Sequence, residues 1–286
     1  MRIGFIGTGS MGQPMVNNLI RKGFAVAAYD VAPAALGAAA KLGAATAGST
    51  AEAAKGSDLV ITMLPSSSHV ETAYLGPGGV LEGAAAGRLC VDMSTINPSV
   101  SRRVAEAARG RGLRFLDAPV SGGVPGATEG TLTIMVGGEP ADLEEARPAL
   151  AAMGKNIIHV GPVGSGEVAK VCNNLISGVA MVAVSEAFRI AEAFGVDPKV
   201  LTDVIARSSG ATWVMEHVHP VPGMVAKAPA THDYAPVFTT DLMATRDGES
   251  KRRPVEFRPP SFFSSSRLTA VIGPVGEHVS VCYILM

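Results

Sequence analysis

Short β-rich runs alternate with alanine-rich helical stretches over roughly the first 160 residues, and this alternation restricts the fold more than any other feature. Strands separated by helix-length connections predict βαβ units, in which parallel strands form one sheet and helices cover both faces. The expected strands are Ile3–Ile6, Ala25–Tyr29, Leu59–Met63, Leu89–Asp92, Phe115–Ala118, Leu132–Val136 and Ile157–Val160. The expected helices are Met11–Lys22, Pro33–Lys41, His69–Tyr74, Pro98–Arg111 and Ala141–Met153. The sequence therefore predicts an α/β fold with a doubly wound, mostly parallel sheet.

A glycine-rich turn, Gly7-Thr-Gly9-Ser-Met-Gly12, follows the first expected strand and precedes a helix. Gly7 permits the tight turn, Gly9 lets the backbone approach a pyrophosphate, and Gly12 lets the helix pack closely on the strand. The helix N-terminus supplies amide donors to the phosphates. A glycine-rich loop of no special purpose is the alternative, but the flanking strand and helix favour dinucleotide binding.

An acid closes the second expected strand, as a dinucleotide site requires. Asp30 lies 18 residues beyond Gly12, close to the roughly 20 expected for the carboxylate that holds the ribose hydroxyls. Its charge repels a 2′-phosphate, and no arginine stands beside it, so NAD is favoured over NADP. The alternative is a surface aspartate that caps the next turn.

Three later segments follow strand ends, where ligands bind in open α/β sheets. Leu64 and Pro65 end one strand, and Thr95 follows another, so these residues are expected to face the cofactor, although either segment alone is more often an ordinary loop. The segment Ser121-Gly122-Gly123 follows a third strand, and its two glycines free consecutive backbone amides for a carboxylate. By itself this segment is equally compatible with a tight turn.

A long apolar helix is expected from the turn at Gly164 to about Phe194, with Ser165 as a candidate cap and Glu167 in its first turn. Lys170 and Asn174 share one face because they are four residues apart. Cys172, on another face, is expected to be inert core. A lysine on such a helix either reaches solvent or is held in a site, and the helix alone does not decide between them.

Composition narrows the partners. The 286 residues are 47% hydrophobic and 17% charged, with a formal net charge of −1, so no nucleic-acid or anionic membrane partner is expected. The three cysteines are too few and scattered for a disulfide framework or a zinc site, and no metal is expected. The first strand begins at once, without a targeting segment, and the run 175–184 is short for a membrane span. The cytoplasm is the expected location.

Five motifs, in order, resemble the β-hydroxyacid dehydrogenase family, and most closely its 3-hydroxyisobutyrate dehydrogenases. They are Gly4–Gly12, Met63–Pro65, Asp92–Thr95, Asp117–Gly123 and Gly164–Asn174. Ser208–Trp213 followed by Pro220–Gly223 favours the hydroxyisobutyrate branch, although enzymes acting on tartronate semialdehyde, glyoxylate and succinic semialdehyde share most of the motifs.

The resemblance implies an NAD-binding Rossmann domain over 1–162, then a helical substrate and dimerisation domain over 163–244, reached through a long inter-domain helix. It implies NAD-dependent oxidation of 3-hydroxyisobutyrate to methylmalonate semialdehyde in valine catabolism, by a homo-oligomer, dimer or tetramer. Lys170 is the implied catalytic residue, a general acid/base whose ammonium loses its proton more easily when partly desolvated. Implied substrate contacts are Ser121, Gly122, Gly123 and Asn174. Implied cofactor contacts are Gly7, Thr8, Gly9, Ser10, Met11, Asp30, Leu64, Pro65, His69 and Thr95.

The resemblance stops after Ala244, where Thr245 stands in place of a family lysine. The tail 245–286 diverges: residues 248–266 lack a helical period, and two apolar runs, Leu268–Gly273 and Val279–Leu285, suit strands rather than helices. A replaced C-terminus raises a contrasting hypothesis. The chain could be a non-catalytic NAD-binding relic.

Overall fold

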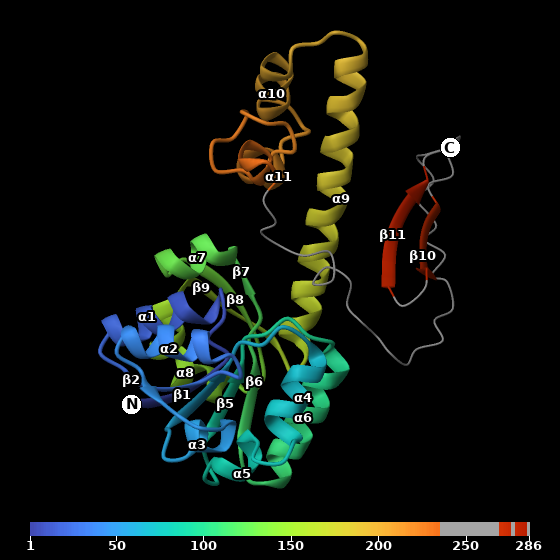
Figure 1. Ribbon diagram of the computed structural model, residues 1–286. Coiled ribbons are helices and arrows are strands. Elements are labelled where there is room, and N and C mark those ends of the chain that lie inside the picture. Colours follow the sequence, from blue (N-terminus) through green and yellow to red (C-terminus); the bar gives the residue numbers. More distant parts are fainter. Residues whose placement is uncertain (235–268, 276–277, 285–286) are drawn as a thin grey trace. The chain divides into compact units, whose positions relative to one another are not determined.

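The computed structural model in Figure 1 describes residues 1–234, 269–275 and 278–284. The chain divides into two compact units, one that includes Met1–Lys170 and one assigned to Val171–Met243, of which residues 171–234 are described. The expected domain limits at 162 and 244 stay a prediction.

A nine-stranded sheet forms the centre of the first unit, in the order β3-β2-β1-β4-β5-β6-β8-β7, with β9 paired to β8. All pairings from β3 to β6 are parallel, whereas β8 runs antiparallel to β6 and β7. The mostly parallel sheet is therefore confirmed. The strands are β1 (Arg2–Ile6), β2 (Ala25–Tyr29), β3 (Ala45–Thr46), β4 (Leu59–Thr62), β5 (Leu89–Asp92), β6 (Arg114–Asp117), β7 (Val120–Ser121), β8 (Leu132–Gly137) and β9 (Gly154–Gly161).

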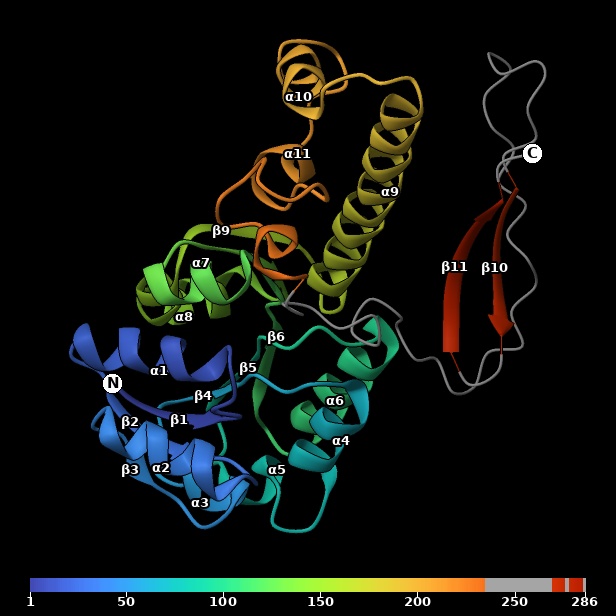
Figure 2. The same cartoon turned by 45° about the horizontal axis from the view of Figure 1, so that its top comes forward.

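Helices cover both faces of this sheet (Figure 1, Figure 2). Alternate strand residues point to opposite faces, so Phe5 packs with Leu19 of α1 and Leu150 of α8, whereas Ile6 packs in a second core with Val70 of α4. The helices are α1 (Gly12–Arg21), α2 (Pro33–Lys41), α3 (Thr50–Ala54), α4 (Ser67–Leu75), α5 (Val80–Gly83), α6 (Pro98–Gly110), α7 (Gly123–Glu129) and α8 (Pro140–Met153). Two opposite apolar faces explain why the central strands lack a polar alternation.

The second unit is helical in its described part, as expected. Helix α9 (Ser165–Ala193) begins in the first unit and continues through the second, followed by α10 (Pro198–Ala206), α11 (Trp213–His217) and a 3-10 turn, η1 (Pro229–His232). Val184 and Phe188 of α9 pack with Val214 and Met215 in a small core. Other apolar side chains of α9 remain exposed, and Ile176 is 71% exposed.

Length and composition alone would let α9 cross a membrane, because it has 29 residues and a mean hydropathy of 1.5 in an 18-residue stretch. The run 175–184, judged short for a membrane span from the sequence, is only part of this helix. A single such helix is weak evidence for a membrane span, since helices of soluble proteins pass the same criterion.

The two runs expected to be strands in the tail form an antiparallel pair, β10 (Thr269–Val275) and β11 (His278–Ile284). The prediction of strands rather than helices at these positions is therefore confirmed. The stretch 248–266, expected to be irregular, and position 245, where a family lysine is expected, lie outside the described residues.

Candidate functional site

The carboxyl ends of β2, β1, β4, β5 and β6 lie next to one another at one edge of the sheet. Backbone hydrogen bonds extend this pairing one residue beyond the strands. They run from Gly7 N to Tyr29 O (2.9 Å), Met63 N to Ile6 O (2.9 Å), Met93 N to Thr62 O (2.8 Å) and Ala118 N to Asp92 O (2.7 Å). The segments that follow these strands, which the sequence predicts to be near the ligand, therefore begin side by side at this edge of the sheet.

The three glycines after β1 differ in their surroundings. Gly7 has a φ of +92°, and a Cβ there would collide with the carbonyl oxygen of Met63. A Cβ on Gly12 would collide with the carbonyl oxygen of Gly7, so α1 starts in close contact with the turn. Gly9 has no atom within 4 Å of a Cβ position. Open space at Gly9 between two tightly packed glycines fits a pyrophosphate that approaches the backbone.

Asp30 is half-buried after β2, and its carboxylate holds the glycine turn. Its Oδ2 accepts a hydrogen bond from Thr8 N at 2.6 Å. Its Oδ1 accepts from Ala32 N at 2.8 Å, so Asp30 also caps the following turn. The cap expected as the alternative role of Asp30 is therefore present, and its role toward the ribose stays a prediction.

Side-chain hydrogen bonds join the segments after β4 and β5. Leu64 N donates to Ser94 Oγ at 2.8 Å, and Asn97 N donates to Ser67 Oγ at 3.1 Å. These bonds bring Leu64 and Pro65 beside the Thr95 segment. His69 lies on α4 with its ring exposed, and its Nδ1 lies 2.7 Å from Ser66 Oγ.

The segment after β6 passes through β7 into α7. Ser121 is half-buried at the end of β7, and Gly122 and Gly123 are exposed with φ values of +131° and +60°. Left-handed backbone at two successive residues favours glycine at both. The structure thus gives these residues the glycine-dependent turn that either a substrate loop or a tight turn needs.

The start of α9 is held by Asp117, the last residue of β6. Its carboxylate accepts from Gly164 N at 2.6 Å and from Glu167 N at 3.0 Å. Ser165 is the first residue of the helix, so the cap expected from Ser165 is wrong. A carboxylate from a distant strand satisfies the free amides instead.

Lys170 follows on the second turn of α9 and is 7% exposed. Burial lowers the pKa of its ammonium, and the negative charge that Glu167 can carry partly opposes this effect. Asn174 lies one turn later on the same helix and is half-buried. Cys172 is exposed, so its expected place in the core is wrong: the helix turns it away from the face of Lys170.

Three buried carboxyl groups gather near this turn, and the sequence argument did not assign them to the site. Asp92, Asp117 and Glu167 are each 0% exposed. Burial is the largest cause that raises the pKa of each, to about 6 for Asp92 and to about 10 for Glu167. Within the described residues, Asp92 Oδ2 and Glu167 Oε1 have no hydrogen-bond partner. The sequence indicates only that Asp92 and Asp117 each end a strand. The structure shows that β5 and β6 pair these two residues directly.

Two family models match the chain. The NAD-binding domain of 6-phosphogluconate dehydrogenase matches residues 2–161, and the model described as NAD-binding of NADP-dependent 3-hydroxyisobutyrate dehydrogenase matches residues 164–246. The first match covers the glycine turn, Asp30 and all nine strands of the sheet. NAD is therefore the cofactor that the site and the matches support.

Individual relatives agree. An NAD-dependent L-serine dehydrogenase of Pseudomonas aeruginosa is 47% identical over 243 residues, 85% of this chain and 82% of the relative. A 3-hydroxyisobutyrate dehydrogenase of the same organism is 45% identical over 241 residues, covering 84% and 81%. A solved Mycobacterium tuberculosis 3-hydroxyisobutyrate dehydrogenase with L-serine is 44% identical, with a TM-score of 0.80 over 85% of this chain and 82% of that one.

An NAD-binding fold with these relatives defines an NAD-dependent oxidoreductase that acts on a CH–OH group. The chain belongs to the β-hydroxyacid dehydrogenase family and is similar to its 3-hydroxyisobutyrate dehydrogenases.

Proposed function

We propose that the chain oxidises 3-hydroxyisobutyrate to methylmalonate semialdehyde with NAD, as a step of valine catabolism. The observation that carries this proposal is Lys170, a buried lysine on α9, whose first turn is capped by Asp117 at the end of β6. The similarity to 3-hydroxyisobutyrate dehydrogenases supports the choice of substrate. We also propose domain limits of 1–162, 163–244 and 245–286.

The cofactor is held by residues at the carboxyl edge of the sheet. In this proposal the turn after β1 receives the pyrophosphate at Gly9, and Asp30 holds the ribose hydroxyls while its charge disfavours a 2′-phosphate. The bound nicotinamide supplies the hydride acceptor. The proposed contacts are Gly7, Thr8, Gly9, Ser10, Met11, Asp30, Leu64, Pro65, His69 and Thr95.

Lys170 handles the proton. Oxidation of an alcohol releases a proton from oxygen, and a neutral amine at Lys170 Nζ would take it as a general base. Burial favours the neutral amine because desolvation disfavours the charged form. In the reverse direction the ammonium would return the proton. Asn174 would hold the substrate oxygen, and the amides of Ser121–Gly123 would bind the carboxylate.

L-Serine is a second candidate substrate, because one relative is an L-serine dehydrogenase and one solved relative was determined with L-serine. The two acids share a primary alcohol, two carbons from the carboxylate carbon, and differ by a methyl group in place of an ammonium. A buried ammonium requires a partner, whereas a methyl group requires only apolar contact. The ratio of kcat/KM for the two substrates would therefore report the polarity around that carbon.

NADH formation with 3-hydroxyisobutyrate and L-serine, each with NAD and NADP, tests the proposal. We expect the highest kcat/KM with 3-hydroxyisobutyrate and NAD. A higher kcat/KM with L-serine would make L-serine the substrate in place of 3-hydroxyisobutyrate. Reduction of tartronate semialdehyde, glyoxylate or succinic semialdehyde faster than that of methylmalonate semialdehyde would likewise assign that compound as the substrate. NAD binding without turnover on any substrate would favour the non-catalytic relic.

We propose a cytoplasmic homo-oligomer, a dimer or tetramer, with no nucleic-acid or membrane partner. A net charge of −1 supports the absence of an electrostatic attraction to either. The family model that matches residues 164–246 contains α9, which supports a place for this helix within the protein rather than in lipid. Sedimentation of the purified chain without detergent would test the oligomeric state and the absence of a membrane partner. We expect a dimer or tetramer that stays in solution.

A further inference from the structure

We propose that Glu167 is a positioning residue for this reaction: its buried carboxyl ties the turn of α9 that carries Lys170 to the cofactor segment after β5. The inference rests on the proposed role of Lys170 as the proton carrier. It adds a residue that neither the motif nor the comparisons assign to a role.

The tie consists of two hydrogen bonds at one residue. Glu167 Oε2 accepts from Ile96 N at 3.1 Å, and Ile96 directly follows Thr95. Glu167 N donates to Asp117 Oδ2 at 3.0 Å. The residue therefore connects α9 to the ends of both β5 and β6. Lys170 lies three residues later, on the same helix face, so its backbone position depends on this junction.

Burial and neighbouring charge favour a neutral Glu167 carboxyl. Asp92 from β5, Asp117 from β6 and Lys170 from α9 are the titratable groups that act on it. Its Oε1 has no partner among the described residues, and an ionised carboxylate with one hydrogen bond is costly to bury. Burial first, and then Asp92, raise its pKa to about 10, although Lys170 opposes this. Protonation would remove the charge that Oε1 would otherwise carry without a donor among the described residues.

A neutral Glu167 has a consequence for Lys170. An ionised Glu167 would stabilise the ammonium and hold its proton, whereas a neutral one leaves burial as the main influence on its pKa. The amine form is then accessible nearer neutral pH. Glu167 therefore positions Lys170 through the hydrogen bond to Ile96 N without acting as its counter-ion.

Three variants at this position test the proposal. Glu167→Gln keeps a neutral group and an acceptor for Ile96 N, so it should retain at least about a third of kcat, with the Lys170-dependent limb of the pH profile unmoved. Glu167→Ala removes the side-chain bond to Ile96 N, keeps the backbone bond from residue 167 to Asp117, and should lower kcat by about tenfold or more, a size typical of a displaced catalytic group. NAD affinity should stay within about twofold, because no cofactor contact is removed. Glu167→Asp withdraws the carboxyl by one carbon and should show the same loss of kcat. It replaces the alanine variant in this test if Glu167→Ala does not fold.

Asn18→Ala is the matched control, because Asn18 Nδ2 also makes a buried bond to a distant backbone group, Ala127 O, at 2.7 Å. It should lose stability without losing kcat. Full kcat in folded Glu167→Ala or Glu167→Asp would overturn the proposal. A shift of the pH limb by one unit or more to lower pH in Glu167→Gln would overturn it too, since that is the signature of a lost counter-ion. Normal turnover in Lys170→Ala would instead refute the proposed function itself.

Discussion

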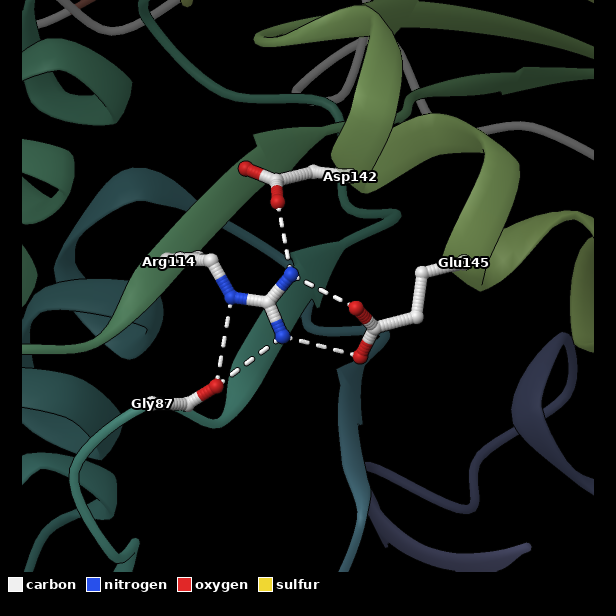
Figure 3. Close-up of polar contacts among 4 residues, drawn as sticks. All are labelled: Gly87, Arg114, Asp142 and Glu145. Carbon is white, nitrogen blue, oxygen red and sulfur yellow. Dashed lines mark hydrogen bonds and ion pairs between the residues drawn. The ribbon is translucent and has the colours of Figure 1, made fainter.

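The charged residues at the two ends of strand β6 differ in burial and in the kind of partner they bind. At its start, the Arg114 guanidinium donates to Gly87 O, to Asp142 Oδ1 at 2.8 Å and to both oxygens of Glu145 at 2.6 and 2.9 Å (Figure 3). The Arg114 side chain is 37% exposed. At its end, Asp117 is fully buried and accepts from the backbone of α9. The first charge has oppositely charged partners, and the second has backbone amides.

The same contrast holds for the neighbouring strands. Asp58, just before β4, has a side chain that is 46% exposed and accepts from Arg2 N and from Arg88. Asp92, at the end of β5, is buried, and one of its oxygens has no partner in the described residues. The charged side chains at the amino edge are partly exposed and paired, as is usual for surface groups that stabilise a fold. Buried carboxyls with unsatisfied oxygens are common where a protein handles substrates or protons. This difference supports the proposed placement of the chemistry at the carboxyl edge.

The largest expected effect comes from the glycine turn of that edge. Gly12→Ala should lower the free energy of unfolding by about 3 kcal/mol, because its Cβ would collide with the backbone at Gly7. Gly9→Ala has free space and should leave stability unchanged while weakening NAD binding by roughly tenfold or more. Urea unfolding and calorimetric NAD titration measure these quantities. Equal effects of both variants on stability would contradict the different roles of the two glycines.

Stability should depend on pH with opposite signs at the two edges. Burial raises the pKa of Asp92 from 3.8 to about 6, so its stabilising contribution is complete below about pH 3.8 and is lost as pH rises through 6. The free energy of unfolding of Asp92→Asn, relative to that of the wild type, should therefore be higher at pH 7.5 than at pH 4, by on the order of 1–3 kcal/mol.

Asp58 is the control for that measurement. Its pKa is lowered, first by the hydrogen bond from Arg2 N, so its contribution is present above pH 3.8 and is lost as pH falls. Asp58→Asn should destabilise the protein at pH 7.5 more than at low pH. The same sign for both variants in urea unfolding would break the comparison between the edges.

A smaller effect is expected at the amino edge. Arg114→Ala should cost about 1 kcal/mol of stability, because its ion pairs are partly screened by water, and should leave kcat/KM unchanged. Arg147→Ala, which removes an exposed pair with Glu144 on α8, should cost less stability than Arg114→Ala. Thermal unfolding and steady-state kinetics measure the two quantities. A lower kcat in Arg114→Ala would show that the amino edge also supports the chemistry.

The long elements could be predicted from sequence because hydrophobic periodicity and helix signals act locally. Helix α2 and strands β2 and β5 have the expected limits. Strands β3 and β7 and helices α3, α5 and α7 were missed, because segments of two to seven residues are too short to show a period.

The candidate site divides in the same way. The glycine turn and Asp30 could be located, because their roles follow from spacing along one βαβ unit. The buried group of Asp92, Asp117 and Glu167 could not, because it depends on the register between β5 and β6 and on where α9 begins. Capping of α9 by Asp117 rather than Ser165 is the same failure, since the cap comes from 47 residues away.

Turnover of Lys170→Ala, measured beside NAD affinity, tests the role of the carboxyl edge most directly. Lys155→Ala, at an exposed lysine of β9, is the matched control and should behave as wild type. Loss of the proton carrier should lower kcat by at least about a hundredfold, the usual size of acid–base catalysis, with NAD affinity unchanged. Near-wild-type turnover in Lys170→Ala would contradict the assignment of proton transfer to this buried lysine.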